Sequence, residues 1–232
     1  MSDSPLSPAE WACLGLSLRV ALCSAALTAV PGIALGWLLA RKSFPAKELV
    51  DAAVHAPLVV PPVATGYLLL ATLGRNGPLG KWLWESLGIS VAFTWWAAVL
   101  ASTVVALPLM VRSVRLAVQR VDPRLEEAAT TLGAGPVRTW ATVTLPLAMP
   151  GILAGLVLAF ARSLGEFGAT ITFAGNLAGE TRTLPLAVYD SMQIPGGEAQ
   201  AMRLVGVSVL LSLGALLASE LMSKRRGRAP RA

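Results

Sequence analysis

The sequence predicts an all-α, polytopic membrane protein with about five transmembrane helices. Of its 232 residues, 55% are apolar and only 14% are charged, against roughly 25% charged residues in a typical soluble domain. Several runs without Asp, Glu, Lys or Arg also approach or exceed the roughly 20 residues that a helix needs to cross a bilayer. Disordered, collagen-like and disulfide-rich classes are excluded, because their compositions are polar, glycine-periodic or cysteine-rich.

Five such runs are the predicted spans: residues 20–40, 52–74, 86–111, 139–161 and 204–219. The first run is too long for a signal peptide and follows no basic segment, so we expect it to remain as a span. The last run is short, but Leu221 and Met222 extend it beyond Glu220. Residues 167–179 are apolar and too few to cross, so they form an interfacial or re-entrant segment or extend the fourth helix.

The distribution of basic residues predicts the orientation. With five spans, the loops on one side hold 13 Lys and Arg residues and those on the other side hold six. The first set is 41–51, 112–138 and the tail after residue 219; the second is 1–19, 75–85 and 162–203. Cytoplasmic loops are enriched in Lys and Arg, so we expect the N-terminus outside and the C-terminus inside. This asymmetry explains the net charge of +6 better than a nucleic-acid partner does.

Prolines interrupt the predicted spans at several points. Each proline removes a backbone donor and kinks its helix, and the freed carbonyls then need protein or water partners. Proline and glycine are common in membrane helices, but the density around Pro57, Pro61 and Pro62 favours a lined path over a passive anchor. Pro61 and Pro62 are therefore candidate pore residues. Five helices are few for a complete pore, so a homodimer or heterodimer is expected.

A short amphipathic helix is predicted in the loop 112–138. Asp122 is a typical N-cap residue, Pro123 suits the first helical position, and Gly133 suits the position just past the end. The ten residues between Asp122 and Gly133 give about 15 Å of helix. Leu125, Ala128, Ala129 and Leu132 share one face.

This loop helix either rests on the membrane surface or docks onto another protein. Membrane-surface helices usually carry Lys or Arg and bulky apolar residues. Here Glu126 and Glu127 lie in the N-terminal half, where the helix dipole favours acidic groups, and half of the apolar face is alanine. Small residues permit close approach to a groove, which favours docking.

The loop also carries a pattern of fixed residues. Glu127-Ala128-Ala129, then Gly133, then Val143 and Leu145-Pro146 resemble the EAA signature of binding-protein-dependent ABC importer permeases, which usually have Ile at the position of Val143. Further segments are similar to the permease subunits of molybdate importers, and sulfate and tungstate permeases share parts of them. They are ARKSFPAKELVD, PLVVPPVATGYLLL, PLMVRSVRLA, TLGAG, LAFARSLGEFGATITF and GETRTLPLAVY.

The resemblance implies a single permease domain over residues 1–232 with the type I ABC importer fold, in the bacterial cytoplasmic membrane. It implies a cytoplasmic coupling helix at 122–133 that inserts into an ATPase. The implied partners are a second copy of the chain, two ABC ATPase subunits that hold ATP and Mg²⁺, and an extracytoplasmic molybdate-binding protein. The coupling residues are expected to be Glu126, Glu127, Ala128, Ala129, Leu132 and Gly133.

No catalytic or cofactor motif stands out. The chain has no phosphate-binding P-loop, so ATP hydrolysis is expected in the partner, and a single His cannot build a multi-His metal site. The alternatives are a permease for sulfate, thiosulfate or tungstate and, more remotely, a membrane-embedded enzyme, which would lack the residues it needs. A passive anchor would not explain the docking helix.

The segment 162–166 holds a pair of opposite charges at the end of the fourth predicted span. Arg162 and Glu166 are i, i+4 on a helix and can pair. Charges at this depth usually face protein or water, so the pair is either a gate beside the path or a structural ion pair. Ser163 and Thr170 are the further candidate pore residues.

Overall fold

The computed structural model describes the backbone of residues 6–226 and the side chains of residues 6–217, and every element in this part of the chain is helical. The elements in chain order are α1 (Pro8–Arg41), α2 (Lys47–Val59), α3 (Pro62–Leu73), α4 (Pro78–Leu87), α5 (Trp95–Gln119), α6 (Pro123–Thr131), α7 (Pro136–Thr139), the π-helical η1 (Trp140–Thr144), α8 (Leu145–Leu164), α9 (Gly168–Phe173), α10 (Leu184–Gln193) and α11 (Glu198–Arg226).

Four helical stretches within the described residues are long and apolar enough to cross a bilayer. They are α1, α5, the continuous α7–η1–α8 stretch and α11. The pair α2 and α3 also passes this test, but its two helices are bent by 114°. The prediction of about five spans is therefore confirmed when the bent pair counts as one.

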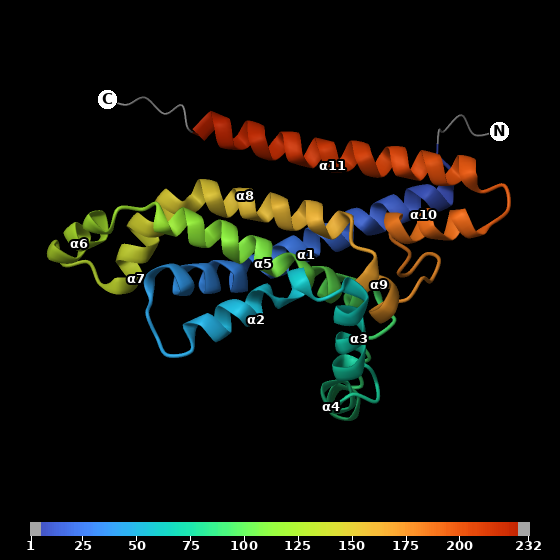
Figure 1. Cartoon of the computed structure of the whole chain (residues 1–232), viewed down its shortest axis with the longest axis horizontal. Helices are drawn as coiled ribbons and strands as arrows, with labels where there is room; N and C mark the ends of the chain where they lie inside the picture. Colours follow the sequence, from blue (N-terminus) through green and yellow to red (C-terminus); the bar gives the residue numbers. More distant parts are fainter. Residues whose placement is uncertain (1–5, 227–232) are drawn as a thin grey trace.

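The bend explains why the predicted span 52–74 is not one straight helix. Pro61 and Pro62 stand at the break, where Val60 and Pro61 have extended backbones with ψ of 132° and 133°. A residue that precedes proline is driven out of the α region, and proline itself cannot donate to the helix. Figure 1 shows α3 leaving the long axis of the bundle, with α4 beyond it.

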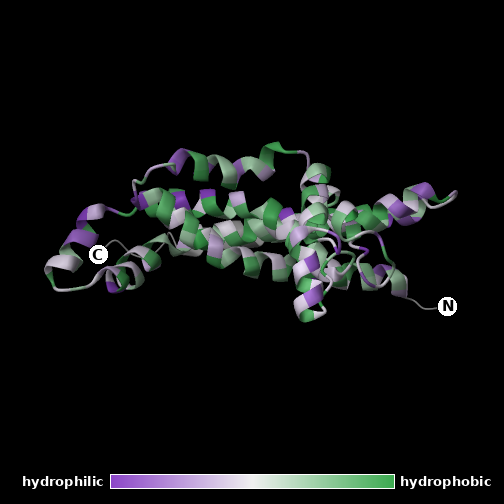
Figure 2. Ribbon diagram, turned by 90° about the horizontal axis from the view of Figure 1, so that it is seen from below, coloured by the Kyte–Doolittle hydropathy of each residue, from purple (hydrophilic) through white to green (hydrophobic). Residues whose placement is uncertain are grey.

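The core of the bundle lies where α1, α5 and α8 meet. Met110, Val114 and Ile152 are buried there. A Cβ on Gly36 of α1 would lie 2.6 Å from the Cβ of Val114. Glycine therefore lets α1 and α5 approach closely, as small residues do in membrane helix packing. Figure 2 shows hydrophobic residues along the bundle and hydrophilic ones gathered toward its ends.

Hydroxyl groups connect the same three helices. The Oγ atoms of Ser24 on α1 and Ser163 on α8 are 2.9 Å apart, and Thr103 on α5 donates to Ser24 at 3.3 Å. All three residues are buried. Such bonds replace water partners inside a membrane protein and hold helices together.

The two ends of the bundle differ. The loop elements α6 and α7 lie at one end, called here the α6 end, whereas α9, α10 and the start of α1 lie at the other, the α9 end (Figure 1). At the α9 end, Ser7 and Glu10 form a capping box that starts α1, and Glu10 pairs with Arg203 of α11 at 3.1 Å. This ion pair fixes α11 to the bundle.

Two predicted boundaries need correction. The run 86–111 is not helical throughout, because α4 ends at Leu87, Gly88 takes a left-handed φ of 66°, and α5 begins only at Trp95. Residues 167–179 do not extend the fourth span, since the helix stops at Gly165 and α9 follows as a separate short helix packed against α3 and α5. Its burial fits a re-entrant segment. The end of the predicted basic tail, residues 227–232, lies outside the described residues.

Candidate functional site

The loop helix expected at 122–133 is present as α6. The Asp122 carboxylate accepts a hydrogen bond from the backbone N–H of Arg124 at 3.0 Å, and Pro123 occupies the first helical position. At the other end Gly133 has a φ of 86° and its N–H donates to the carbonyl of Thr130 at 3.0 Å. This left-handed conformation is one that glycine adopts without strain.

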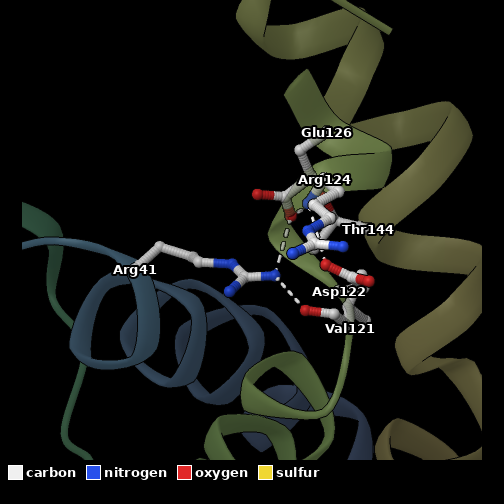
Figure 3. A network of polar contacts seen from close by, with 6 residues as sticks. All are labelled: Arg41, Val121, Asp122, Arg124, Glu126 and Thr144. Atoms are coloured by element: carbon white, nitrogen blue, oxygen red, sulfur yellow. Dashed lines mark hydrogen bonds and ion pairs between the residues drawn. The ribbon is translucent and has the colours of Figure 1, made fainter. Parts of the chain in front are cut away.

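One carboxylate of α6 points into the protein and fixes the helix. Glu126 Oε1 lies 3.1 Å from Arg41 Nη2 at the end of α1 and accepts a hydrogen bond from Thr144 Oγ1 of η1 at 2.6 Å (Figure 3). Arg41 also donates to the carbonyl of Val121 at 2.8 Å. The helix α6 is thereby joined to α1 and, through η1, to α8.

The remaining predicted coupling residues are accessible. Leu132 is 89% exposed and Leu125 is 48% exposed, although both are apolar. Glu127, Ala128 and Gly133 are exposed as well, and Ala129 is half-buried. We call the exposed apolar side of α6 the docking face. Glu126 differs from the rest of the predicted set because it anchors the helix from inside.

The π-helical segment η1 connects the loop to α8. The N–H of Leu145 bonds to the carbonyl of Trp140, five residues earlier, where an α-helix would use the carbonyl four residues earlier. Pro146, which follows directly, has no N–H to continue the α-helical pattern. Single π turns within helices are frequent at functional sites. Here the π turn carries Thr144, which contacts Glu126.

At the α9 end, the predicted pair of charges is confirmed. Arg162 Nη1 lies 2.8 Å from Glu166 Oε2, and the Glu166 side chain is only 2% exposed. The other oxygen, Oε1, accepts from the backbone N–H of Ala169 at 2.9 Å. Glu166 thus connects the end of α8 to the first turn of α9.

The short helix α9 in turn packs on α3. A Cβ on Gly168 would lie 2.8 Å from the Cβ of Pro62, and a Cβ on Gly66 would lie 2.6 Å from the carbonyl oxygen of Ala169. The candidate pore residues Pro62, Glu166 and Arg162 therefore belong to one connected region. A chain of contacts runs from α6 through η1 and α8 to α9 and α3.

The other candidate pore residues lie differently. Ser163 is buried among the hydroxyls of the core and contributes to helix packing. Thr170 is 1% exposed, and its hydroxyl is buried without a hydrogen-bond partner among the described residues. Pro61 is exposed at the bend.

Two contributors to this arrangement were missed by sequence reasoning. Arg41 and Thr144 hold Glu126, yet they lie 85 and 18 residues away from it in the chain. In the sequence, Arg41 is one of several basic residues of a loop and Thr144 lies within an apolar run, so no local pattern marks either residue. The same holds for Gly66 and Gly168, whose importance comes from the approach of α3 to α9.

The contact between α3 and α9 gives a prediction about stability. We expect Gly66→Val to lower the thermal unfolding temperature of the purified protein in detergent, because the new Cβ meets backbone atoms of Ala169 that cannot turn away. Overpacking of this kind costs about 1–3 kcal/mol. Gly15→Val on α1 is the matched control, since its Cβ would meet nothing within 4 Å. Equal unfolding temperatures for the two variants would refute the tight contact.

Among the described residues, no group of three or more His, Cys, Asp or Glu side chains is placed to hold a metal ion. His55, the only histidine, contacts the Asp51 carboxylate at 3.1 Å on the same helix. Its position is that of a helix-surface residue.

The fold and the site together define a multi-pass membrane permease: apolar spans, one of them broken by prolines, and an anchored amphipathic loop helix with a free apolar face. Residues 32–225 match the family of binding-protein-dependent transport system inner membrane components, and the chain belongs to this family.

The chain is similar to relatives along nearly its whole length. It is 54% identical to the molybdenum transport system permease protein ModB of Haemophilus influenzae over 93% of this chain and 94% of the relative. It is 52% identical to ModB of Escherichia coli K12, over 94% and 96% respectively. A probable sulfate transport system permease protein cysT from Nephroselmis olivacea is 35% identical over 91% of this chain and 74% of the relative.

Solved structures support the fold. A chain of a bacterial alginate ABC transporter, crystallised with a periplasmic protein that holds an alginate pentasaccharide, superposes with a TM-score of 0.76 at 18% identity over 96% of this chain and 81% of that one. A chain of the MetNI methionine ABC transporter in an inward-facing conformation gives 0.69 at 20% identity, over 95% and 99%. The fold is that of an ABC importer permease.

Proposed function

We propose that this protein is the membrane-embedded permease subunit of an ATP-driven importer that carries molybdate across the bacterial cytoplasmic membrane. The observation that carries the proposal is the 52–54% identity to molybdenum permeases over more than nine-tenths of the chain. The anchored α6, with its free docking face, supplies the physical reason for an ATPase partner.

Coupling begins at α6. The docking face enters a groove on a cytoplasmic ATPase, one of two ABC ATPase subunits that bind ATP and Mg²⁺, while this chain holds no cofactor of its own. Because Glu126 joins α6 to α1 and to η1, a displacement of the ATPase is passed to two spans at once. The contacts of α8 with α9, and of α9 with α3, carry that displacement toward the bend at Pro61 and Pro62.

A second copy of the chain supplies the other wall of the path. Beside their contacts with α5 and α9, α2 and α3 expose several large apolar side chains within the described residues. Val59 is 85% exposed, and Val63, Tyr67 and Leu68 are each more than half exposed. Two chains that pack through these surfaces would enclose a path beside the broken span, where bent backbone is tolerated because protein surrounds it.

Transport follows alternating access in this proposal. A molybdate-binding protein outside the membrane delivers the anion to the outward-open dimer, which forms when ATP closes the two ATPase subunits. ATP hydrolysis then returns the dimer to its inward-open conformation, from which the anion enters the cytoplasm. In this orientation the α6 end is cytoplasmic, the N-terminus lies outside and the C-terminus inside, as the 13 to six distribution of basic residues favours.

Other oxyanions are the main alternatives to molybdate as the transported substrate. Sulfate, thiosulfate and tungstate resemble molybdate in charge and shape, and the relative that is 35% identical is a probable sulfate permease. The greater identity to molybdenum permeases favours molybdate. A membrane-embedded enzyme has no observation in its favour.

Uptake of radioactive molybdate tests the function. Cells that lack their own molybdate permease should accumulate the anion only when they express this chain together with its ATPase and binding protein. We expect molybdate and tungstate to compete, while a large excess of sulfate leaves uptake unchanged. Uptake of labelled sulfate instead of molybdate would overturn the assignment of substrate, and no ATP-dependent uptake of either anion would overturn the transport function.

A further inference from the structure

An apolar groove lies at the α6 end between α1 and the α7–η1 segment. Its volume is about 300 Å³, and its lining residues are all apolar: Ile33, Ala34, Trp37, Pro136, Val137 and Trp140. Val137 remains 79% exposed. An apolar hollow of this kind on a membrane protein needs a hydrophobic occupant.

One basic side chain lies over a wall of the groove, and a second basic residue is adjacent in sequence to a lining residue. Lys42 Nζ lies 5.7 Å from the centre of the Trp37 ring, which places the ammonium over one wall. Arg138 directly follows Val137 in the four-residue helix α7. Neither forms an ion pair with any described side chain, and no carboxylate lines the groove. The positive charge there is therefore uncompensated by the protein.

The groove also lies at the ends of two candidate spans, α1 and the α7–η1–α8 stretch. The α1 span ends at Arg41, one turn beyond Trp37, and Trp140 begins η1 at the start of the fourth span. Tryptophans concentrate at this level of a bilayer, and basic residues beside them attract the anionic lipids of the cytoplasmic leaflet.

We propose that this groove is a binding site for an anionic phospholipid of the inner leaflet. An acyl chain lies between Trp37 and Trp140, and the phosphate group contacts Lys42 and Arg138. The assignment to the inner leaflet rests on the orientation given under the proposed function. A second copy of the chain is the less suitable occupant, because a stable protein interface buries about 800 Å² on each partner and the exposed surface of α2 and α3 already offers an extended apolar face.

The site would influence coupling through its position. Trp140, one wall of the groove, is the first residue of η1, and Thr144 at the last position of η1 bonds to Glu126 of α6. A bound lipid therefore supports the segment that connects the docking helix to α8. This makes the site a point at which membrane composition would act on the permease.

Native mass spectrometry of the purified chain, titrated with phosphatidylglycerol and separately with phosphatidylcholine, tests the proposal. Ala34→Phe fills the groove from an exposed position on α1, and Ala26→Phe, exposed on the same helix outside the groove, is its matched control. We expect Ala34→Phe to weaken phosphatidylglycerol binding by more than about tenfold, since the acyl chain loses its cavity. Lys42→Gln should weaken it about fivefold, and Lys81→Gln at the opposite end should not.

Three results would overturn the site. Equal affinity for the two lipids would show that the basic residues do not select the headgroup. Unchanged phosphatidylglycerol binding by Ala34→Phe would show that the lipid does not bind in the groove. Loss of dimer rather than of lipid in the Ala34→Phe spectra would assign the groove to a second copy. Because lipid binding is measured without ATPase, binding protein or molybdate, failure of the transport proposal leaves these outcomes unaffected.

Discussion

Replacement of Gly133 by valine should abolish molybdate uptake while the protein still accumulates in the membrane. Gly133 ends α6 with a φ of 86°, and a Cβ there would meet nothing within 4 Å, so the substitution acts on the backbone rather than on packing. For a residue with a Cβ, this left-handed conformation costs about 1–2 kcal/mol, and the cost is higher for a β-branched residue such as valine. A penalty of that size lowers the population of the native turn about tenfold or more, and the docking face then points away from the ATPase.

The control for this variant is Gly135→Val. Gly135 lies two residues further on, its φ is an ordinary −68°, and a Cβ there would also meet nothing within 4 Å. Uptake per membrane-inserted molecule should stay near that of the wild type. Glu127→Lys should behave like Gly133→Val, because it reverses the charge of an exposed residue of α6 on the helix that meets the ATPase in the proposal. Normal uptake by both Gly133→Val and Glu127→Lys at normal abundance would disprove the coupling role of α6.

The sequence was most informative where one local signal decides the structure. Asp122, Pro123 and Gly133 each have a preferred place at a helix end, and α6 begins where they predicted and ends one residue earlier, at Thr131. The long charge-free runs likewise located the spans, because the bilayer sets a minimum length for each. The pairing of Arg162 with Glu166 was expected from an i, i+4 spacing on one helix; the pair forms, but α8 ends at Leu164 and Glu166 lies just beyond it.

The features that the sequence did not reveal depend on how helices meet in space. Prolines indicated a kink near residue 61, but the angle of 114° is set by the packing of α3 against α9 as well as by the missing donors. The inward direction of Glu126 depends on Arg41, 85 residues away. Glu126 and Glu127 are adjacent, so they point to different sides of the helix. The sequence does not reveal which of the two sides faces the protein.

A test of the Arg162–Glu166 pair should separate a gate from a structural ion pair. Arg162→Met leaves a carboxylate that is 2% exposed without its partner, an arrangement that costs about 3 kcal/mol or more when burial is complete and less here because Arg162 is 30% exposed. Glu166→Gln removes the charge but keeps an oxygen to accept from the N–H of Ala169. We expect the double variant to lose less uptake than either single variant, since neither group is then left unpaired, whereas additive losses would indicate independent roles.

The Glu10–Arg203 pair provides the matched comparison for the single and double variants of Arg162 and Glu166. It too joins a carboxylate that is 2% exposed to an arginine, but it ties α1 to α11 and has no contact with α9 in the described structure. Variants of this pair should lower the unfolding temperature in detergent and reduce uptake only in proportion to abundance. Variants of Arg162 and Glu166 should also reduce uptake per folded molecule, because Glu166 holds α9 against the end of α8 and α9 packs on the broken span. If both pairs affect uptake only through abundance, the Arg162–Glu166 pair is a structural contact and the gate lies elsewhere.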